Sequence, residues 1–92
     1  MRDQLGRACL SIMLNIAEGS AKFSERDRKN FHITARGSAF ECASLITFLS
    51  EEDEITELLA SELNLTFEDI SRMLYTMIRN LEEKVHSSSN RR

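Results

Sequence analysis

The sequence lacks the residues that usually interrupt regular structure, with no proline and only three glycines among its 92 residues. Proline and glycine are the strongest signals for turns, so a chain with so few of them predicts a small number of long helices. The alternating apolar and polar runs that are typical of strands are also missing. We therefore expect an all-α fold.

Cysteine is scarce as well. The two cysteines, Cys9 and Cys42, lie inside apolar helical patterns and lack the spacing of a metal site or a redox motif. Free cysteines in such patterns are commonly buried, so we expect both to be reduced core residues. No secretory leader opens the chain, and no apolar run approaches the roughly 20 residues that span a bilayer. These absences predict a cytoplasmic protein with no membrane partner.

The length and the charge distribution suggest association with other molecules. A single core of 92 residues is only marginally stable on its own, so we expect a homo-oligomer. The net charge of −3 conceals a strong segregation. Residues 1–36 carry seven basic and four acidic groups. Residues 37–70 carry no basic and nine acidic groups, and residues 71–92 carry five basic and two acidic groups. A basic surface can still bind phosphate if the fold gathers it on one side.

Helical periodicity predicts three long helices, at about 3–18, 24–52 and 57–85, in a single bundle domain over residues 1–86. The serine-rich, charged stretch 87–92 has nothing to bury and is predicted to be disordered.

Capping signals set the predicted helix ends. Asp3, Ser24 and Thr56 are the expected N-caps, and Gly19 is the expected stop of the first helix. A further capping pattern just after Asn64 leaves open whether the third helix breaks there.

Apolar residues recur at alternating spacings of four and three, which is the pattern of left-handed packing in an up-down antiparallel bundle. They are Phe31, Ala35, Ser38, Cys42, Leu45 and Leu49 in the second helix, and Leu59, Leu63, Phe67, Ile70, Leu74, Met77 and Leu81 in the third. Gly37 in mid-helix predicts the close approach of a neighbouring backbone. The first helix is apolar nearly all round, so two other helices from this chain cannot cover it.

No set of residues has the pattern of a catalytic, cofactor or metal site, so we expect no enzyme activity. Glu83 and His86 have the spacing of a carboxylate-bridged metal motif, but bundle sites of that kind need the motif twice and two further glutamates. His32 lies among basic residues on an expected charged surface, where a solvated or phosphate-facing histidine fits better than a general base.

A basic group begins the second helix, where the helix dipole disfavours cations. Its members are Lys22, Arg26, Arg28, Lys29 and Arg36. Two interpretations remain open: a solvated face balanced by Glu25 and Asp27, or contact with an anion such as RNA or DNA.

The run from Gln4 to Ser20, QLGRACLSIMLNIAEGS, closely resembles the signature of a bacterial family of four-helix-bundle proteins encoded in intervening sequences of 23S ribosomal RNA. The likeness extends through 35–41 and 70–74. It implies an up-down four-helix bundle, often a homopentamer, with no accepted enzyme activity. A related branch accompanies the reverse transcriptases of diversity-generating retroelements and binds both the polymerase and nucleic acid, which implies a scaffold role.

One departure from the family concerns the start of the chain. The family usually has another helix of about thirty residues before the signature. Without it, a groove is expected beside the first and third helices, which either another copy fills or a longer chain supplies.

Within the signature, Asn15 and Glu18 are polar residues on a helix that is otherwise expected to be buried, so each is predicted to need a partner. Arg36 or Arg7 is the expected partner of Glu18. The leading functional hypothesis is an oligomeric scaffold that binds nucleic acid or a ribonucleoprotein. The alternative is a protein-binding adaptor with an open apolar groove.

Overall fold

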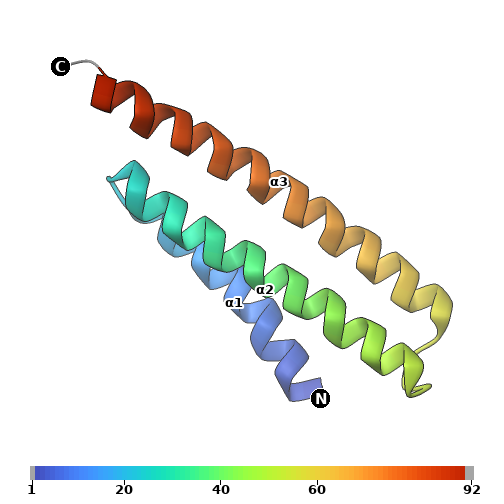
Figure 1. Ribbon diagram of the computed structural model, residues 1–92. Coiled ribbons are helices and arrows are strands. Elements are labelled where there is room, and N and C mark those ends of the chain that lie inside the picture. Colours follow the sequence, from blue (N-terminus) through green and yellow to red (C-terminus); the bar gives the residue numbers. More distant parts are fainter. Residues whose placement is uncertain (1, 91–92) are drawn as a thin grey trace.

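The computed structural model contains three helices and, within residues 2–90, no strand. Helix α1 spans Arg2–Ala21, α2 spans Glu25–Glu51 and α3 spans Glu57–Asn90. The structure describes the backbone of residues 2–90 and the side chains of residues 2–86. The helices run up, down and up in a narrow body of 57 × 20 × 13 Å (Figure 1). The predicted all-α, bundle-like fold is confirmed.

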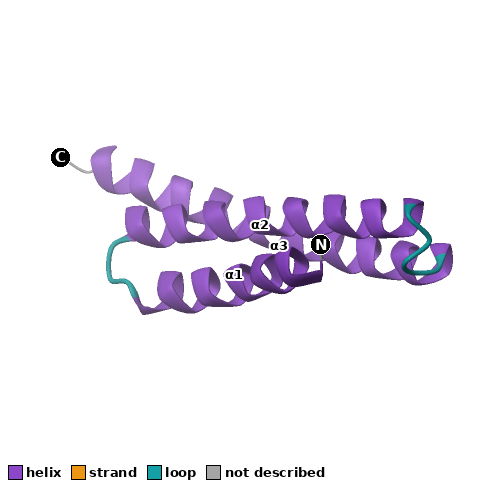
Figure 2. Cartoon of the chain, turned by 90° about the horizontal axis from the view of Figure 1, so that it is seen from below, coloured by secondary structure: helices purple, strands orange, loops and turns teal. Residues whose placement is uncertain are grey.

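Helix α2 is the middle of the structure, because it packs against α1 on one side and against α3 on the other. Within the described residues, no Cα atom of α1 comes within 8 Å of a Cα atom of α3. Figure 2 shows the two connections at opposite ends of the body. The three helices therefore form two antiparallel pairs that share α2.

The core follows from this arrangement. Ala8, Ile12, Ala39 and Cys42 form a buried cluster between α1 and α2, against which Phe67 and Ile70 of α3 also pack. Further along α2 and α3, Ile46, Leu74, Ile78 and Leu81 are buried as well. The buried residues of α2 follow one stripe at alternating spacings of three and four, with Ser38 beside it: His32, Ala35, Ala39, Cys42, Ile46 and Leu49.

The helix starts agree with the predicted caps in two of three cases. The Asp27 amide donates a hydrogen bond to Ser24 Oγ at 3.4 Å, and the Leu59 amide donates one to Thr56 Oγ1 at 3.1 Å. Asp3 is not a cap, because α1 already begins at Arg2. Between α2 and α3 the chain turns at Asp53, whose φ of 57° is in the left-handed region. The acidic residues 51–54 do mark this turn.

Two predicted helix ends were wrong, and the question left open near Asn64 is settled in favour of one continuous helix. Helix α1 runs through Gly19 to Ala21. Helix α3 is unbroken near Asn64, because Thr66 donates its hydroxyl to the Glu62 carbonyl instead of capping a new helix. It also continues to Asn90, since serine tolerates a helix and no proline or glycine stops it. Of the predicted tail, residues 91–92 lie outside the described residues.

The glycine that allows close packing is Gly19, not Gly37. A Cβ atom on Gly19 would lie 3.0 Å from Phe31 Cβ and 3.4 Å from the Arg28 carbonyl oxygen. A Cβ atom on Gly37 would meet no described atom within 4 Å. The close contact therefore occurs where α1 ends against the start of α2, and Gly37 faces an open groove.

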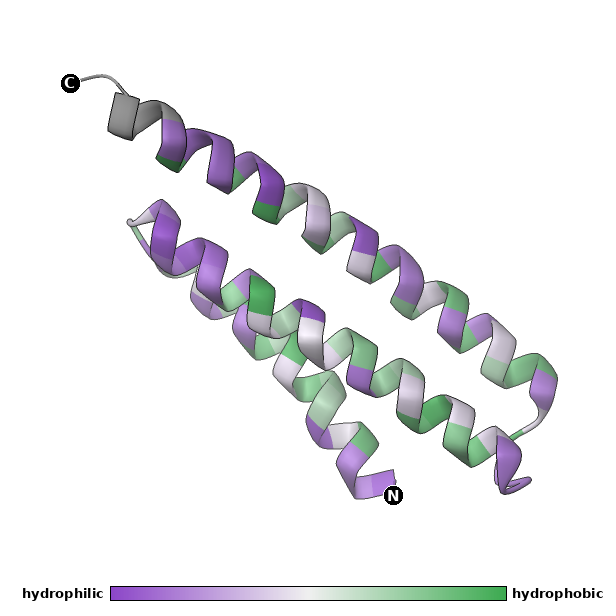
Figure 3. Cartoon of the chain, viewed as in Figure 1, coloured by the Kyte–Doolittle hydropathy of each residue, from purple (hydrophilic) through white to green (hydrophobic). Residues whose placement is uncertain are grey.

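One face of α1 is apolar and uncovered. Leu10, Met13 and Leu14 follow one another at helical spacing, and their exposed fractions are 49 to 62%. Figure 3 shows the hydrophobic residues of α1 in the middle of the helix and hydrophilic residues at its N-terminal end. The prediction that α2 and α3 cannot cover α1 is confirmed.

Candidate nucleic-acid interface

The structure divides the predicted basic group into two parts. Arg26, Lys29 and Arg36 lie at helical spacing along one face of α2, which Ile33 and Phe40 continue. Lys22 lies in the connection before α2, and Arg28 points to a different side of that helix, toward α1. Among the described side chains, none of Arg26, Lys29 and Arg36 makes an ion pair.

Arg36 is held between two aromatic rings from different helices. Its guanidinium carbon lies 5.1 Å from the centre of the Phe40 ring on α2 and 5.0 Å from the centre of the Tyr75 ring on α3. Its Nε atom is buried and has no hydrogen-bond partner among the described residues. Both rings keep about half of their surface exposed, at 54% for Phe40 and 45% for Tyr75. A cation and two half-exposed aromatic rings therefore lie together.

Arg79 extends this cluster along α3. It donates a hydrogen bond from Nη1 to the Tyr75 hydroxyl oxygen at 3.2 Å, and its guanidinium carbon lies 6.0 Å from the Tyr75 ring centre. The cluster lines two adjoining cavities between α2 and α3, of about 590 and 480 Å³, which share Arg36 and Phe40. Gly37 lines the larger one, where its missing side chain leaves room. We call this surface the Arg36 groove.

Carboxylates limit the charge of the Arg36 groove. Glu68 binds Arg72 at 2.6 Å, so this pair contributes little net charge. Arg79 lies 3.9 Å from Glu83, and Glu82 lines the far end of the larger cavity. The uncompensated positive charge of this face is therefore that of the α2 stripe. A ligand would meet aromatic surface as well as charge.

The rest of the predicted basic group has partners at the α1–α2 connection. Lys22 lies 3.9 Å from Glu18 and 5.4 Å from the centre of the Phe31 ring. Arg28 donates from Nε to the Lys22 carbonyl oxygen at 2.5 Å. These two residues fix the turn and do not belong to the Arg36 groove.

The polar residues of the signature behave differently from one another. Asn15 donates from Nδ2 to the Ser11 carbonyl oxygen at 2.8 Å and to Ser11 Oγ at 3.1 Å, and Ser11 Oγ lies 2.8 Å from Ser38 Oγ on α2. Asn15 thus has the partner predicted for it. Glu18 was wrongly expected to be buried beside Arg36 or Arg7: its side chain is exposed and pairs with Lys22. Arg7 is exposed on α1.

Comparison with known protein families identifies the family of this chain. Residues 1–76 match the family described as 23S rRNA-intervening sequence protein. The chain belongs to this family. Curated proteins and solved structures give no match. The match covers α1, α2 and most of α3, including every residue of the Arg36 groove named above up to Tyr75.

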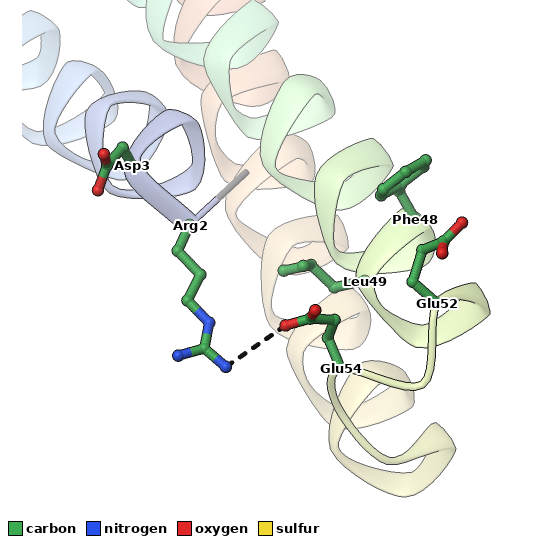
Figure 4. A pocket seen from close by; sticks show the side chains of 6 residues that line it. All are labelled: Arg2, Asp3, Phe48, Leu49, Glu52 and Glu54. Atoms are coloured by element: carbon green, nitrogen blue, oxygen red, sulfur yellow. Dashed lines mark hydrogen bonds and ion pairs between the residues drawn. The ribbon is translucent and has the colours of Figure 1, made fainter.

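A further cavity, at the end of the body away from the α1–α2 connection, has the wrong charge for binding a nucleic acid. It measures about 500 Å³ and lies where α1 begins beside the turn between α2 and α3 (Figure 4). Arg2 Nη2 lies 3.5 Å from Glu54 Oε2, and both side chains are largely exposed. Asp3 and Glu52 also line the cavity, so phosphates are repelled from it.

The remaining chemistry-bearing residues of this family member have structural surroundings. Cys9 and Cys42 are free thiols whose Sγ atoms lie 3.6 Å apart; Cys42 is buried, as predicted, and Cys9 is partly buried. Within the described residues, no group of three or more His, Cys, Asp or Glu side chains could hold a metal ion. In the same part of the chain, no helix is both long and apolar enough to cross a bilayer.

Sequence reasoning missed the aromatic half of the Arg36 groove. Phe40 lies four residues after Arg36, so the sequence alone places the two side chains on the same face of a helix. Tyr75 is 39 positions away and joins the cluster only because α3 packs antiparallel to α2. The antiparallel order of the two helices was predicted, but the register between them was not.

Proposed function

We propose that this chain is a cytoplasmic, non-enzymatic helical scaffold that binds single-stranded nucleic acid in the Arg36 groove. The observation that carries the proposal is the guanidinium of Arg36 held between the half-exposed rings of Phe40 and Tyr75. Proteins that bind single strands combine cations that contact the backbone with aromatic rings on which bases stack. The Arg36 groove offers both.

The strand would be recognised by stacking more than by charge. The exposed faces of Phe40 and Tyr75 suit nucleobases, and each stacked base contributes roughly 1–3 kcal/mol. Arg26, Lys29 and Arg36 would contact phosphates, because they follow one face of α2 and lack ion-pair partners among the described residues. A duplex keeps its bases inside, so a single strand fits this groove better.

The uncovered face of α1 supports assembly as the second part of the proposal. Burying a leucine or methionine side chain contributes roughly 1.5–3 kcal/mol, so covering Leu10, Met13 and Leu14 would stabilise a complex considerably. We propose that copies of the chain associate through this face, in the ring of five that the family resemblance implies. Assembly would also place several Arg36 grooves on one particle.

Salt-dependent binding of a fluorescent single-stranded oligonucleotide tests the nucleic-acid proposal. With three phosphate contacts per protomer, log K should fall against log salt with a slope of about −2. Tyr75→Ala should weaken binding about tenfold and leave the slope unchanged, whereas Lys29→Gln should make the slope shallower by about 0.7. Arg7→Gln removes one charge from exposed α1 and is the matched control. Binding that is absent, or equally weakened by Arg7→Gln, would refute the proposal.

Light scattering on the purified chain tests the assembly proposal. Leu14→Glu places a charge on the uncovered face and should reduce the mass toward that of a monomer, whereas Thr76→Glu, on an exposed position of α3, should not. A wild-type chain that is monomeric at all concentrations would contradict self-assembly. It would favour the adaptor alternative, in which a partner helix covers Leu10, Met13 and Leu14.

A further inference from the structure

A second basic cavity lies at the end of the bundle where α1 ends, α2 begins and the later half of α3 passes (Figure 1). It measures about 350 Å³ and is separate from the Arg36 groove. Its lining residues are Ser20, Arg28, His32, Met77, Asn80, Leu81 and Lys84. Two of them are cations, three are neutral polar groups, and none of the described residues that line it is a carboxylate.

His32 is the buried polar group of this cavity. The sequence predicted it on a charged surface, but its side chain is only 3% exposed. Neither ring nitrogen has a hydrogen-bond partner of good geometry among the described residues, although the Arg28 backbone carbonyl lies close to the ring. Burial lowers the pKa of His32 below its ordinary value of 6.5; interaction with the Arg28 backbone raises the pKa and offsets part of this effect, and the positive charge of Arg28 lowers it slightly. The neutral ring therefore presents one N–H donor at physiological pH.

Arg28 and Lys84 bring positive charge to the same cavity. Arg28 is positioned by the hydrogen bond from its Nε atom to the Lys22 carbonyl, which leaves its terminal nitrogens for other contacts. Neither Arg28 nor Lys84 makes an ion pair with any side chain that the structure describes. Two cations without ion-pair partners, beside a buried imidazole and with no carboxylate among the described lining residues, favour an anion that accepts several hydrogen bonds.

We propose that this cavity binds a phosphate group. Arg28 and Lys84 oppose its charge, and His32, Ser20 and Asn80 donate hydrogen bonds to its oxygens. A phosphate has more acceptor oxygens than a carboxylate and so suits this number of donors. Free inorganic phosphate and the terminal phosphate of a nucleic-acid strand present the same chemistry. The site uses none of the residues proposed to bind nucleic acid, so either proposal can fail alone.

Titration of the purified chain with inorganic phosphate, followed by NMR of the histidine rings, tests the inference. The chain has two histidines, so His32→Gln assigns the signals of His32 and leaves those of His86. Phosphate should shift the His32 signals saturably at constant ionic strength and should raise the pKa of His32, because an adjacent anion favours the charged ring. The signals of His86 should move much less.

Charge variants make the test specific. Lys84 is exposed, so Lys84→Gln keeps the fold and should weaken phosphate binding about tenfold, the loss expected for one charge-assisted hydrogen bond. Arg7→Gln removes the same charge from exposed α1 outside the cavity and should leave phosphate binding unchanged. Phosphate that leaves the His32 signals in place, or binds equally well to wild type and Lys84→Gln, would overturn the inference.

Two further titrations identify the source of the phosphate. Tighter binding of a 5′-phosphorylated oligonucleotide than of its 5′-hydroxyl counterpart, with the difference lost in Lys84→Gln, supports a strand terminus as the ligand. Equal binding of the two oligonucleotides, together with a saturable response to inorganic phosphate, supports free phosphate.

Discussion

Replacing Gly19 and Gly37 one at a time by alanine separates two roles that glycine plays in this protein. Both residues lie inside helices, where glycine is less favourable than alanine by roughly 0.5–1 kcal/mol. Alanine should therefore stabilise the fold at either position if nothing else changed. The surroundings differ, because only the new methyl group at position 19 would meet its neighbours at short range.

The magnitude follows from the contacts. At position 37 the methyl group meets no described atom within 4 Å, so Gly37→Ala should stabilise the fold by roughly 0.5–1 kcal/mol. At position 19 it would lie 3.0 Å from Phe31 Cβ, which is fixed to the backbone of α2 and cannot rotate away. Overpacking of this kind costs roughly 1–3 kcal/mol. The gain in helix propensity is no larger at Gly19, so Gly19→Ala should be less stable than Gly37→Ala by at least about 1 kcal/mol.

Urea unfolding followed by circular dichroism, at one protein concentration, measures the difference. For a chain of this size a difference of 1 kcal/mol also separates the melting temperatures by roughly 4–8 °C. If Gly19→Ala is as stable as Gly37→Ala, then α1 does not end tightly against α2 and the account of the core at that end is wrong.

Two further predictions concern the core thiol and a helix cap. Burial, with a smaller effect of the Cys9 hydrogen bond, raises the pKa of Cys42 from 9.0 to about 12. The thiol of the unfolded chain ionises first, so the stability of the fold should decrease as pH rises above about 9. The urea midpoint should decrease less in Cys42→Ala than in wild type, and an equal decrease would argue against this cause. Thr56→Ala should cost about 1 kcal/mol by loss of the cap of α3, whereas Thr66→Ala, in mid-helix, should change the urea midpoint little; equal effects would disprove the capping role.

Local signals explain what the sequence predicted well. Ser24 and Thr56 cap their helices because a hydroxyl oxygen and an amide three residues later are brought together by the helix itself. The exposed face of α1 could be predicted because its apolar circumference exceeds what two neighbours can cover.

Features that depend on the register between helices were predicted poorly. Glu18 was expected to be buried with Arg36 or Arg7, yet its side chain is exposed and Lys22, four residues along, is the partner. His32 was placed on the surface because its sequence neighbours are charged, although its own face of α2 is covered. Half of the Arg36 groove comes from α3. Which residues of α3 lie opposite Arg36 depends on how far α3 is shifted along the axis of α2, and the sequence of neither helix shows this shift.

The packing of α2 against both α1 and α3 has a consequence for how the chain folds. Every helix pairing joins segments that are adjacent in sequence, through connections of only a few residues, 22–24 and 52–56. Little loop entropy is lost before contacts form, so this topology belongs with the fast-folding helical proteins, in the microsecond to millisecond range. Either helical hairpin can therefore form first.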